Sequence, residues 1–144
     1  MKMVNFGNDV TADNIRQFVK GGRAVFTLES QKTGAHYTYQ IKAKENDNKT
    51  KIYFISFMTD GTTYNYMGVF NPDNMSIRLT AKSKISADAL VYKAINYFLS
   101  ALAQNRIADQ LIIYHANKCA CCGRELTEPE SVRIGIGPIC REAR

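Results

Sequence analysis

Alternating apolar and polar residues dominate the first half of the chain and indicate β-strands. Tyr37, Tyr39 and Ile41, for example, alternate with polar partners in "AHYTYQIKAK". Short turns that contain glycine, asparagine or aspartate separate such segments, as tight antiparallel connections require. The pattern therefore predicts successive strands at residues 23–30, 35–44, 51–59, 64–70 and 76–82. Consecutive strands joined in this way form an antiparallel meander.

Two segments follow the helical period instead. A short helix is expected after Thr11, whose hydroxyl can cap its first turn, and it should end before Gly21 and Gly22. From Ser86 onward, apolar residues recur every three to four positions, which predicts an amphipathic helix of about 18 residues capped by Ser86. The apolar segment 110–115 predicts a further strand that leads into the cysteine-rich end of the chain.

This order of elements predicts an α+β fold, in which an antiparallel β-meander is covered by one long helix and followed by a C-terminal zinc knuckle or ribbon. The long helix can lie across one face of the sheet. We expect an α+β body at residues 1–110 and a zinc-binding module at residues 111–144. Because no low-complexity tract or flexible linker separates the two, the module should pack on the body.

Composition narrows the class of protein. Apolar residues make up 45% of the 144, which suits a folded protein with one core. No apolar run approaches the roughly 20 residues needed to span a bilayer, and the N-terminal sequence lacks a signal core. A cytoplasmic protein without membrane contact is therefore expected. In that compartment, four cysteines confined to residues 119–140 favour metal binding over disulfides.

The cysteine segment predicts a metal site. Cys119 and Cys122 form a Cys-x-x-Cys turn followed by Gly123, the arrangement of a zinc knuckle, in which both thiolates face one cation. A second turn, "GIGPIC", leads to Cys140. Its two glycines permit a tight turn, so a third thiolate can reach the same ion. Three ligands are thus expected from these two turns.

The fourth ligand is the open question of this site. Cys121 adjoins Cys122, and two consecutive residues rarely direct both side chains at one small ion. His115 lies four residues before Cys119, and a neutral imidazole completes a Cys3His set of the kind that structural zinc accepts. We therefore predict one structural Zn²⁺ held by His115, Cys119, Cys122 and Cys140. Cys121, His36 or a group from outside the chain are the alternatives.

The C-terminal segment resembles a short zinc-ribbon-like domain of unknown function found in hypothetical proteins of bacteriophages and actinobacteria. The shared pattern comprises a histidine, a Cys-x-x-Cys-Gly-Arg turn, a Leu-Thr-x-Pro-Glu-Ser run and a closing Gly-Ile-Gly-Pro-x-Cys. Here the matching residues are His115, Cys119, Cys122, Gly123, Arg124, Leu126, Thr127, Pro129, Glu130, Ser131, Gly135, Ile136, Gly137, Pro138 and Cys140. Cys121 and Arg133 depart from the pattern. The resemblance implies a zinc site and a phage or prophage origin, and it implies no activity.

The charge distribution suggests a partner. Of the formal charge of +6, residues 1–114 contribute most, with 14 Lys or Arg against 9 Asp or Glu. Such an excess favours polyanions, although a soluble surface with additional lysines is the simpler interpretation. The candidate nucleic-acid-binding residues are Lys42, Lys44, Lys49, Lys51, Arg78, Lys82 and Lys84. The candidate stacking residues are Tyr37, Tyr39, Tyr64 and Tyr66, which could equally be core residues.

Two functional hypotheses follow, and neither is enzymatic. The first is a small, zinc-stabilised, basic protein that binds nucleic acid. The alternative is a phage protein that binds a host protein, such as a defence nuclease, and inhibits or redirects it. The chain has no nucleotide-binding glycine loop, no Gly-x-Ser-x-Gly and no His-Glu-x-x-His, so we expect no catalytic activity.

Overall fold

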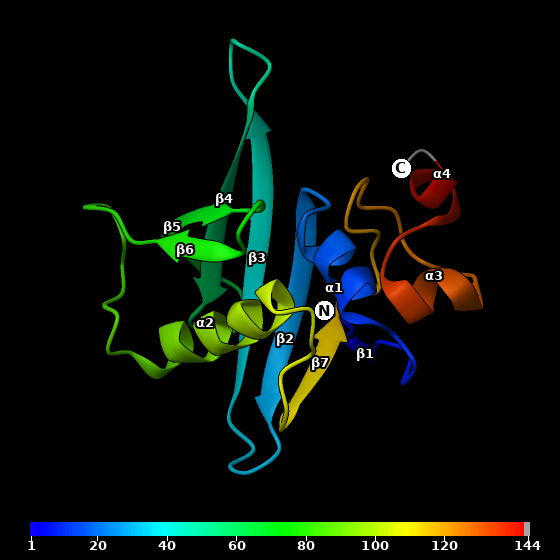
Figure 1. Cartoon of the computed structure of the whole chain (residues 1–144), viewed down its shortest axis with the longest axis horizontal. Helices are drawn as coiled ribbons and strands as arrows, with labels where there is room; N and C mark the ends of the chain where they lie inside the picture. The colour runs from blue at the N-terminus through cyan, green and yellow to red at the C-terminus, as the bar shows by residue number, and fades with distance from the viewer. Residues whose placement is uncertain (143–144) are drawn as a thin grey trace.

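The computed structural model describes residues 1–142, which form one seven-stranded antiparallel sheet with helices on one face and at one edge (Figure 1). The strand order is β1-β7-β2-β3-β4-β5-β6. The elements are β1 (Val4–Asn5), α1 (Ala12–Val19), β2 (Arg23–Ser30), β3 (His36–Glu45), β4 (Lys51–Met58), β5 (Tyr64–Asn71), β6 (Ser76–Arg78), α2 (Leu90–Ala103), β7 (Leu111–His115), α3 (Pro129–Ile134) and α4 (Pro138–Glu142). The predicted α+β class is confirmed.

Strands β2 to β6 form the predicted meander, in sequence order and joined by short turns. The strand predicted at residues 76–82 is shorter, because pairing with β5 ends at Arg78. Beyond it the chain still bonds to β5, where the Lys84 N–H donates to the Tyr66 carbonyl and the hydroxyls of Thr80 and Tyr66 share a hydrogen bond. Strand β1 was not predicted, since two residues carry no alternation.

Strand β7 lies inside the sheet, between β1 and β2. Its residue His115 pairs with both Val4 and Phe26. The predicted boundary between residues 110 and 111 therefore falls just before a strand that belongs to the sheet of the body. The C-terminal module is continuous with that sheet and is not tethered to it.

Helices α1 and α2 cover the same face of the sheet (Figure 1). The Thr11 hydroxyl caps α1 by accepting from the Asn14 N–H, as the sequence predicts. Helix α2 begins at Leu90 with Ala89 as its N-cap, so the predicted cap at Ser86 is wrong. The residues from Ser86 to Ala89 instead form an exposed turn, in which the Ala89 N–H donates to the Ser86 carbonyl.

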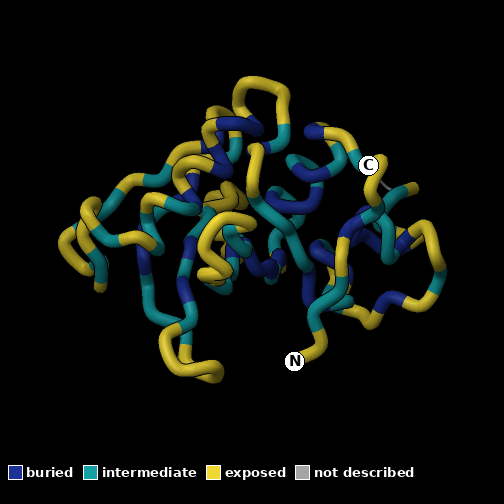
Figure 2. The backbone as a smooth tube through the Cα atoms, turned by 90° about the horizontal axis from the view of Figure 1, so that it is seen from below, coloured by how far each residue is buried: buried dark blue, intermediate teal, exposed yellow. Residues whose placement is uncertain are grey.

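Burial follows the alternation of the strands. On β2 and β3 the buried residues Phe26, Leu28, Tyr39 and Ile41 face the two helices, whereas their neighbours are half-buried or exposed, apart from Thr27. Figure 2 shows the buried stretches in the strands and helices and the exposed ones in the hairpin turns. Across residues 1–142, no helix is both long and apolar enough to cross a bilayer. The opposite face of the sheet, which α1 and α2 leave open, is called the open face below.

Candidate metal centre and basic groove

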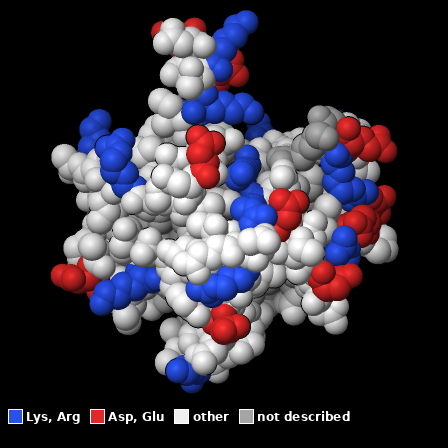
Figure 3. Space-filling view, viewed as in Figure 1, with Lys and Arg blue, Asp and Glu red and all other residues white. Residues whose placement is uncertain are grey.

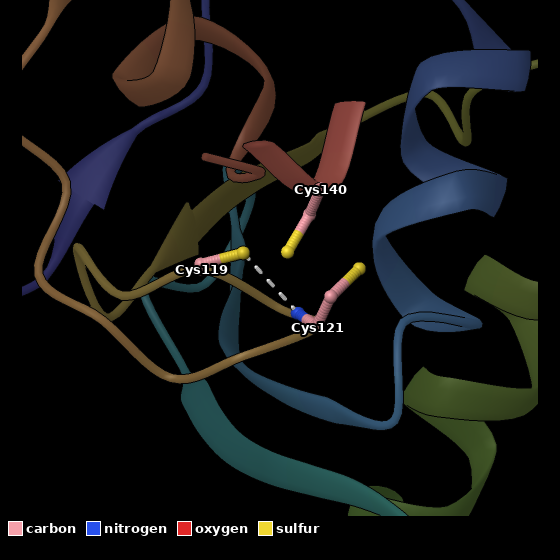
Figure 4. Close-up of side chains that lie close together, drawn as sticks. All are labelled: Cys119, Cys121 and Cys140. Carbon is pink, nitrogen blue, oxygen red and sulfur yellow. Dashed lines mark hydrogen bonds between the residues drawn. The ribbon is translucent and has the colours of Figure 1, made fainter. Parts of the chain in front are cut away.

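Three cysteine sulfurs meet between the knuckle turn and α4. The Sγ atoms of Cys119, Cys121 and Cys140 all lie within 4.8 Å of one another (Figure 4). Tetrahedral zinc with Zn–S bonds of about 2.3 Å holds its sulfurs about 3.8 Å apart. The observed spacing is close to this value, so a small contraction around a cation would complete the geometry. The cluster fits a thiophilic metal ion.

Backbone hydrogen bonds shape the knuckle turn. The Gly123 N–H donates to the Cys119 carbonyl over 2.9 Å, and Gly123 has a φ of 79°, which only glycine adopts readily. The Cys119 sulfur accepts from the N–H groups of Gly137 and Cys121, at 3.2 and 3.4 Å. Such N–H donors stabilise a thiolate, as they do around metal-bound sulfur. The two predicted turns therefore converge on one sulfur.

Ionisation differs across the cluster. Burial opposes ionisation of Cys119, but the N–H groups of Gly137, Cys122 and Cys121 together with the Cys122 thiol lower its pKa to about 7. Burial raises the pKa of Cys140, and its hydrogen bonds to Cys119 and Cys122 act in the same direction. Cys122 is exposed, and its thiol acts on the pKa of both Cys119 and Cys140. Within the described residues, the predicted ligand Cys122 lies outside the group of three sulfurs that meet.

His115 does not lie among the three sulfurs that meet, so the predicted Cys3His set is not assembled in this structure and stays a prediction. Its Nε2 donates to the Val132 carbonyl at 2.7 Å, and its Nδ1 accepts from the Asn117 N–H at 3.0 Å. Its side chain is buried against Phe6 and Phe18, with centroid distances of 4.7 and 6.0 Å. Both ring nitrogens are occupied, so neither has a lone pair free for a metal. Within residues 1–142, Cys121 and not the histidine lies beside the sulfurs of Cys119 and Cys140.

Stability is expected to fall at mildly acidic pH because of His115. Burial lowers its pKa from the ordinary 6.5, although the bond to Val132 acts in the opposite direction. As the pH falls below 6.5, the unfolded chain binds a proton on this histidine before the folded chain does. The contribution of neutral His115 to the free energy of unfolding is therefore complete above pH 6.5 and is lost as the pH falls toward the folded-state pKa.

Chemical denaturation at about pH 7.5 and about pH 5.5 measures this effect. His115→Gln should reduce the loss of unfolding free energy between the two pH values, and His36→Gln, at an exposed position, should leave it unchanged. If the free energy of unfolding depends on pH equally in wild type and His115→Gln, this histidine does not cause the loss of stability.

Hydrogen bonds and ion pairs hold the two short helices α3 and α4 in place. Arg141 donates to the Ser131 hydroxyl and to the Glu128 carboxylate, and so joins α4 to the start of α3. Arg133, which departs from the pattern of the resembled domain, binds Glu130 through two nitrogens and donates to Asp9 at 3.0 Å. Figure 3 shows acidic and basic side chains gathered together over these helices. These contacts hold the N-terminal arm and α4 against α3.

Residues 114–144 match a family of unknown function, DUF6011. The matched region, called the DUF6011 segment below, starts inside β7 and contains all four cysteines. No curated protein and no solved structure matches the chain. The family description assigns no activity, so a function has to be argued from the site.

A basic groove lies beside the metal centre, at the end of the open face. Its volume is about 460 Å³, and its charged lining residues are all basic. They are Arg23, Lys42, Lys44 and Lys118. The Cys122–Gly123 turn forms one wall, because Gly123 lines the groove and the Arg23 guanidinium donates to the Cys122 carbonyl at 3.2 Å. Metal centre and groove share this turn.

The groove continues as a row of side chains across the sheet, called the basic row. Strand pairing places one residue from each of β2 to β6 opposite the next, and residues in such pairs share a face. The row is Arg23, Lys42, Phe54, Val69 and Arg78. A second hollow of about 460 Å³ adjoins its far end, lined by Lys51, Arg78 and one acidic residue, Asp73. Cations thus flank two apolar side chains.

The remaining predicted residues lie elsewhere. Lys49 is in the β3–β4 turn, and Lys82 and Lys84 are exposed in the segment after β6. Tyr39 is fully buried and its hydroxyl donates to the Val91 carbonyl, so it belongs to the core. Tyr37 shares the helix-covered face, whereas Tyr64 and Tyr66 are half-buried on the open face.

Three residues of this surface, Arg23, Lys118 and Phe54, were missed from the sequence. Alternation from the predicted Lys42 and Lys44 indicates the face of Phe54, but only the strand register places it opposite Lys42. Lys118 reaches the groove because β7 inserts beside β2, a long-range pairing without a local signal. On the helix side, Lys and Arg are scattered among acidic residues (Figure 3).

Proposed function

We propose that this protein binds nucleic acid through the basic groove and the basic row, and that a zinc ion held by the DUF6011 segment stabilises the wall of that groove. The observation that carries the proposal is the set of four basic residues around one groove without an acidic lining residue. Phosphate groups are recognised by such clusters, with an affinity that falls steeply as salt rises.

The zinc ligands in this proposal are the four cysteines, Cys119, Cys121, Cys122 and Cys140. A closed four-thiolate site is structural, because no position remains for water. One Zn²⁺ against four thiolates leaves the site with a net charge of −2, which the adjoining Arg23 and Arg124 partly offset. In this proposal zinc affects nucleic-acid binding only by fixing the position of the Cys122–Gly123 turn. The residues that contact the nucleic acid are those of the groove and the sheet.

Titration of labelled oligonucleotides at several salt concentrations tests the proposal. Lys42→Ala/Lys44→Ala should weaken binding by about tenfold or more and reduce the slope of log K against log[salt] by about 1 to 2. The matched control is Lys32→Ala/Lys93→Ala, which removes the same charge from exposed positions on a hairpin turn and on α2. It should change affinity by less than about twofold, since distant charges are screened.

Two outcomes would overturn the proposal. Equal losses of affinity in both double variants would mean that binding depends on the net charge of the protein and not on the groove. Undetectable binding by wild type at about 50 mM salt would exclude a phosphate-contacting site. In that case capture of a stoichiometric protein from nuclease-treated lysate would favour the alternative hypothesis, a protein-interaction module directed at a host protein.

A further inference from the structure

The centre of the basic row is apolar and aromatic. Phe54 lies opposite Lys42 on one side and Val69 on the other, and Arg78 follows on the next strand. Its ring is half-buried on a face that neither α1 nor α2 covers. Ile52, on the same strand face, is 38% exposed. A surface that bound phosphates alone would gain nothing from these side chains.

A second aromatic ring supports Phe54. The ring centroids of Phe54 and Tyr66 lie 6.2 Å apart at an angle of 58°. Tyr66 is held in turn by a hydrogen bond of 3.1 Å between its hydroxyl and that of Thr80. The pair is therefore a positioned platform between cations, with Lys42 beside it and Arg78 two strands away.

We infer that the ligand is single-stranded nucleic acid, with a base stacked on Phe54 beside Tyr66 and its phosphates on Arg23, Lys42 and Arg78. The inference rests on the proposed function and names the form of nucleic acid that fits. A duplex keeps its bases stacked inside and presents phosphates to a sheet, whereas a single strand offers both phosphates and base faces. The row crosses five strands. It is about 19 Å long, which suits a short site of about four nucleotides.

Phe54→Leu tests the stacking, because leucine keeps the apolar contact and removes the aromatic face. Affinity for a single strand should fall about fivefold or more, without a change in the salt slope, since no phosphate contact is lost. Phe54→Leu should bind a duplex of equal length with the same affinity as wild type does. Wild type should bind that duplex more weakly than the single strand. The control is Tyr114→Leu, a half-buried aromatic of the open face on β7, away from the basic row. Melting temperatures establish that both variants fold.

The outcomes separate this inference from the proposed function. Salt-dependent binding of a duplex as tightly as the single strand would overturn the inference and leave nucleic-acid binding standing. So would an affinity of Phe54→Leu for the single strand within about twofold of wild type. Undetectable binding of both forms would overturn the proposed function itself. Titrations of single-stranded DNA and single-stranded RNA of the same sequence identify the sugar that the site prefers.

Discussion

Substituting Cys119 with serine is expected to release the metal and to lower the melting temperature by on the order of 10 °C. Cys119 is fully buried, and its sulfur accepts N–H groups from both turns of the DUF6011 segment. A serine hydroxyl is a poor zinc ligand, so the turns would lose the ion proposed to join them. Metal content by mass spectrometry and thermal unfolding measure the two effects.

The comparison of Cys121→Ser with His115→Gln decides between the two ligand sets. With Cys121 in the cluster, its serine variant should lose or weaken metal binding. His115→Gln should retain one zinc per chain even if its melting temperature falls, because the histidine ring bonds to Val132 and Asn117 and not to the sulfurs. The reverse pattern, with metal kept by Cys121→Ser and lost by His115→Gln, would restore the Cys3His set.

The sheet and helices could be predicted where local pattern and burial agree. Strand β2 matches its predicted bounds, residues 23–30, because alternate side chains contact the core. The start of α2 was predicted three residues early, since Ser86 is a good cap by type but the observed N-cap is Ala89. Local sequence patterns therefore predicted which helices and strands form, whereas burial in the folded protein decides where each of them begins and ends.

The location of the cysteine cluster was predictable from the sequence, but the set of side chains that meet there was not. The spacing of Cys119, Cys122 and Cys140 indicated two converging turns, and the structure brings those turns together. The position of the histidine could not be predicted, because it depends on long-range contacts. Pairing of β7 beside β2 turns His115 toward the helix-covered face, where Phe6 and Phe18 enclose it. Spacing along the sequence contains no information about that face.

The close packing of the DUF6011 segment against α1 gives the second large prediction, at Gly135. This residue ends α3 with a φ of 77°, and its N–H donates to the Ser131 carbonyl. A Cβ there would lie 2.5 Å from Cδ1 of Phe18, itself a buried core residue. Gly135→Ala should therefore cost about 1–2 kcal/mol for the left-handed backbone and about 1–3 kcal/mol more for the clash.

Gly34→Ala is the matched control for this prediction, because Gly34 has a φ of 76° and open space around its Cα. It should cost only the backbone share, about 1–2 kcal/mol. The difference between the two variants, measured by chemical denaturation of zinc-loaded protein, isolates the contact between Gly135 and Phe18. Equal losses in the two variants would mean that the segment can move away from α1 freely. Because the same segment forms the wall of the basic groove, a larger loss in Gly135→Ala would indicate that packing against α1 holds this wall, beside the proposed metal.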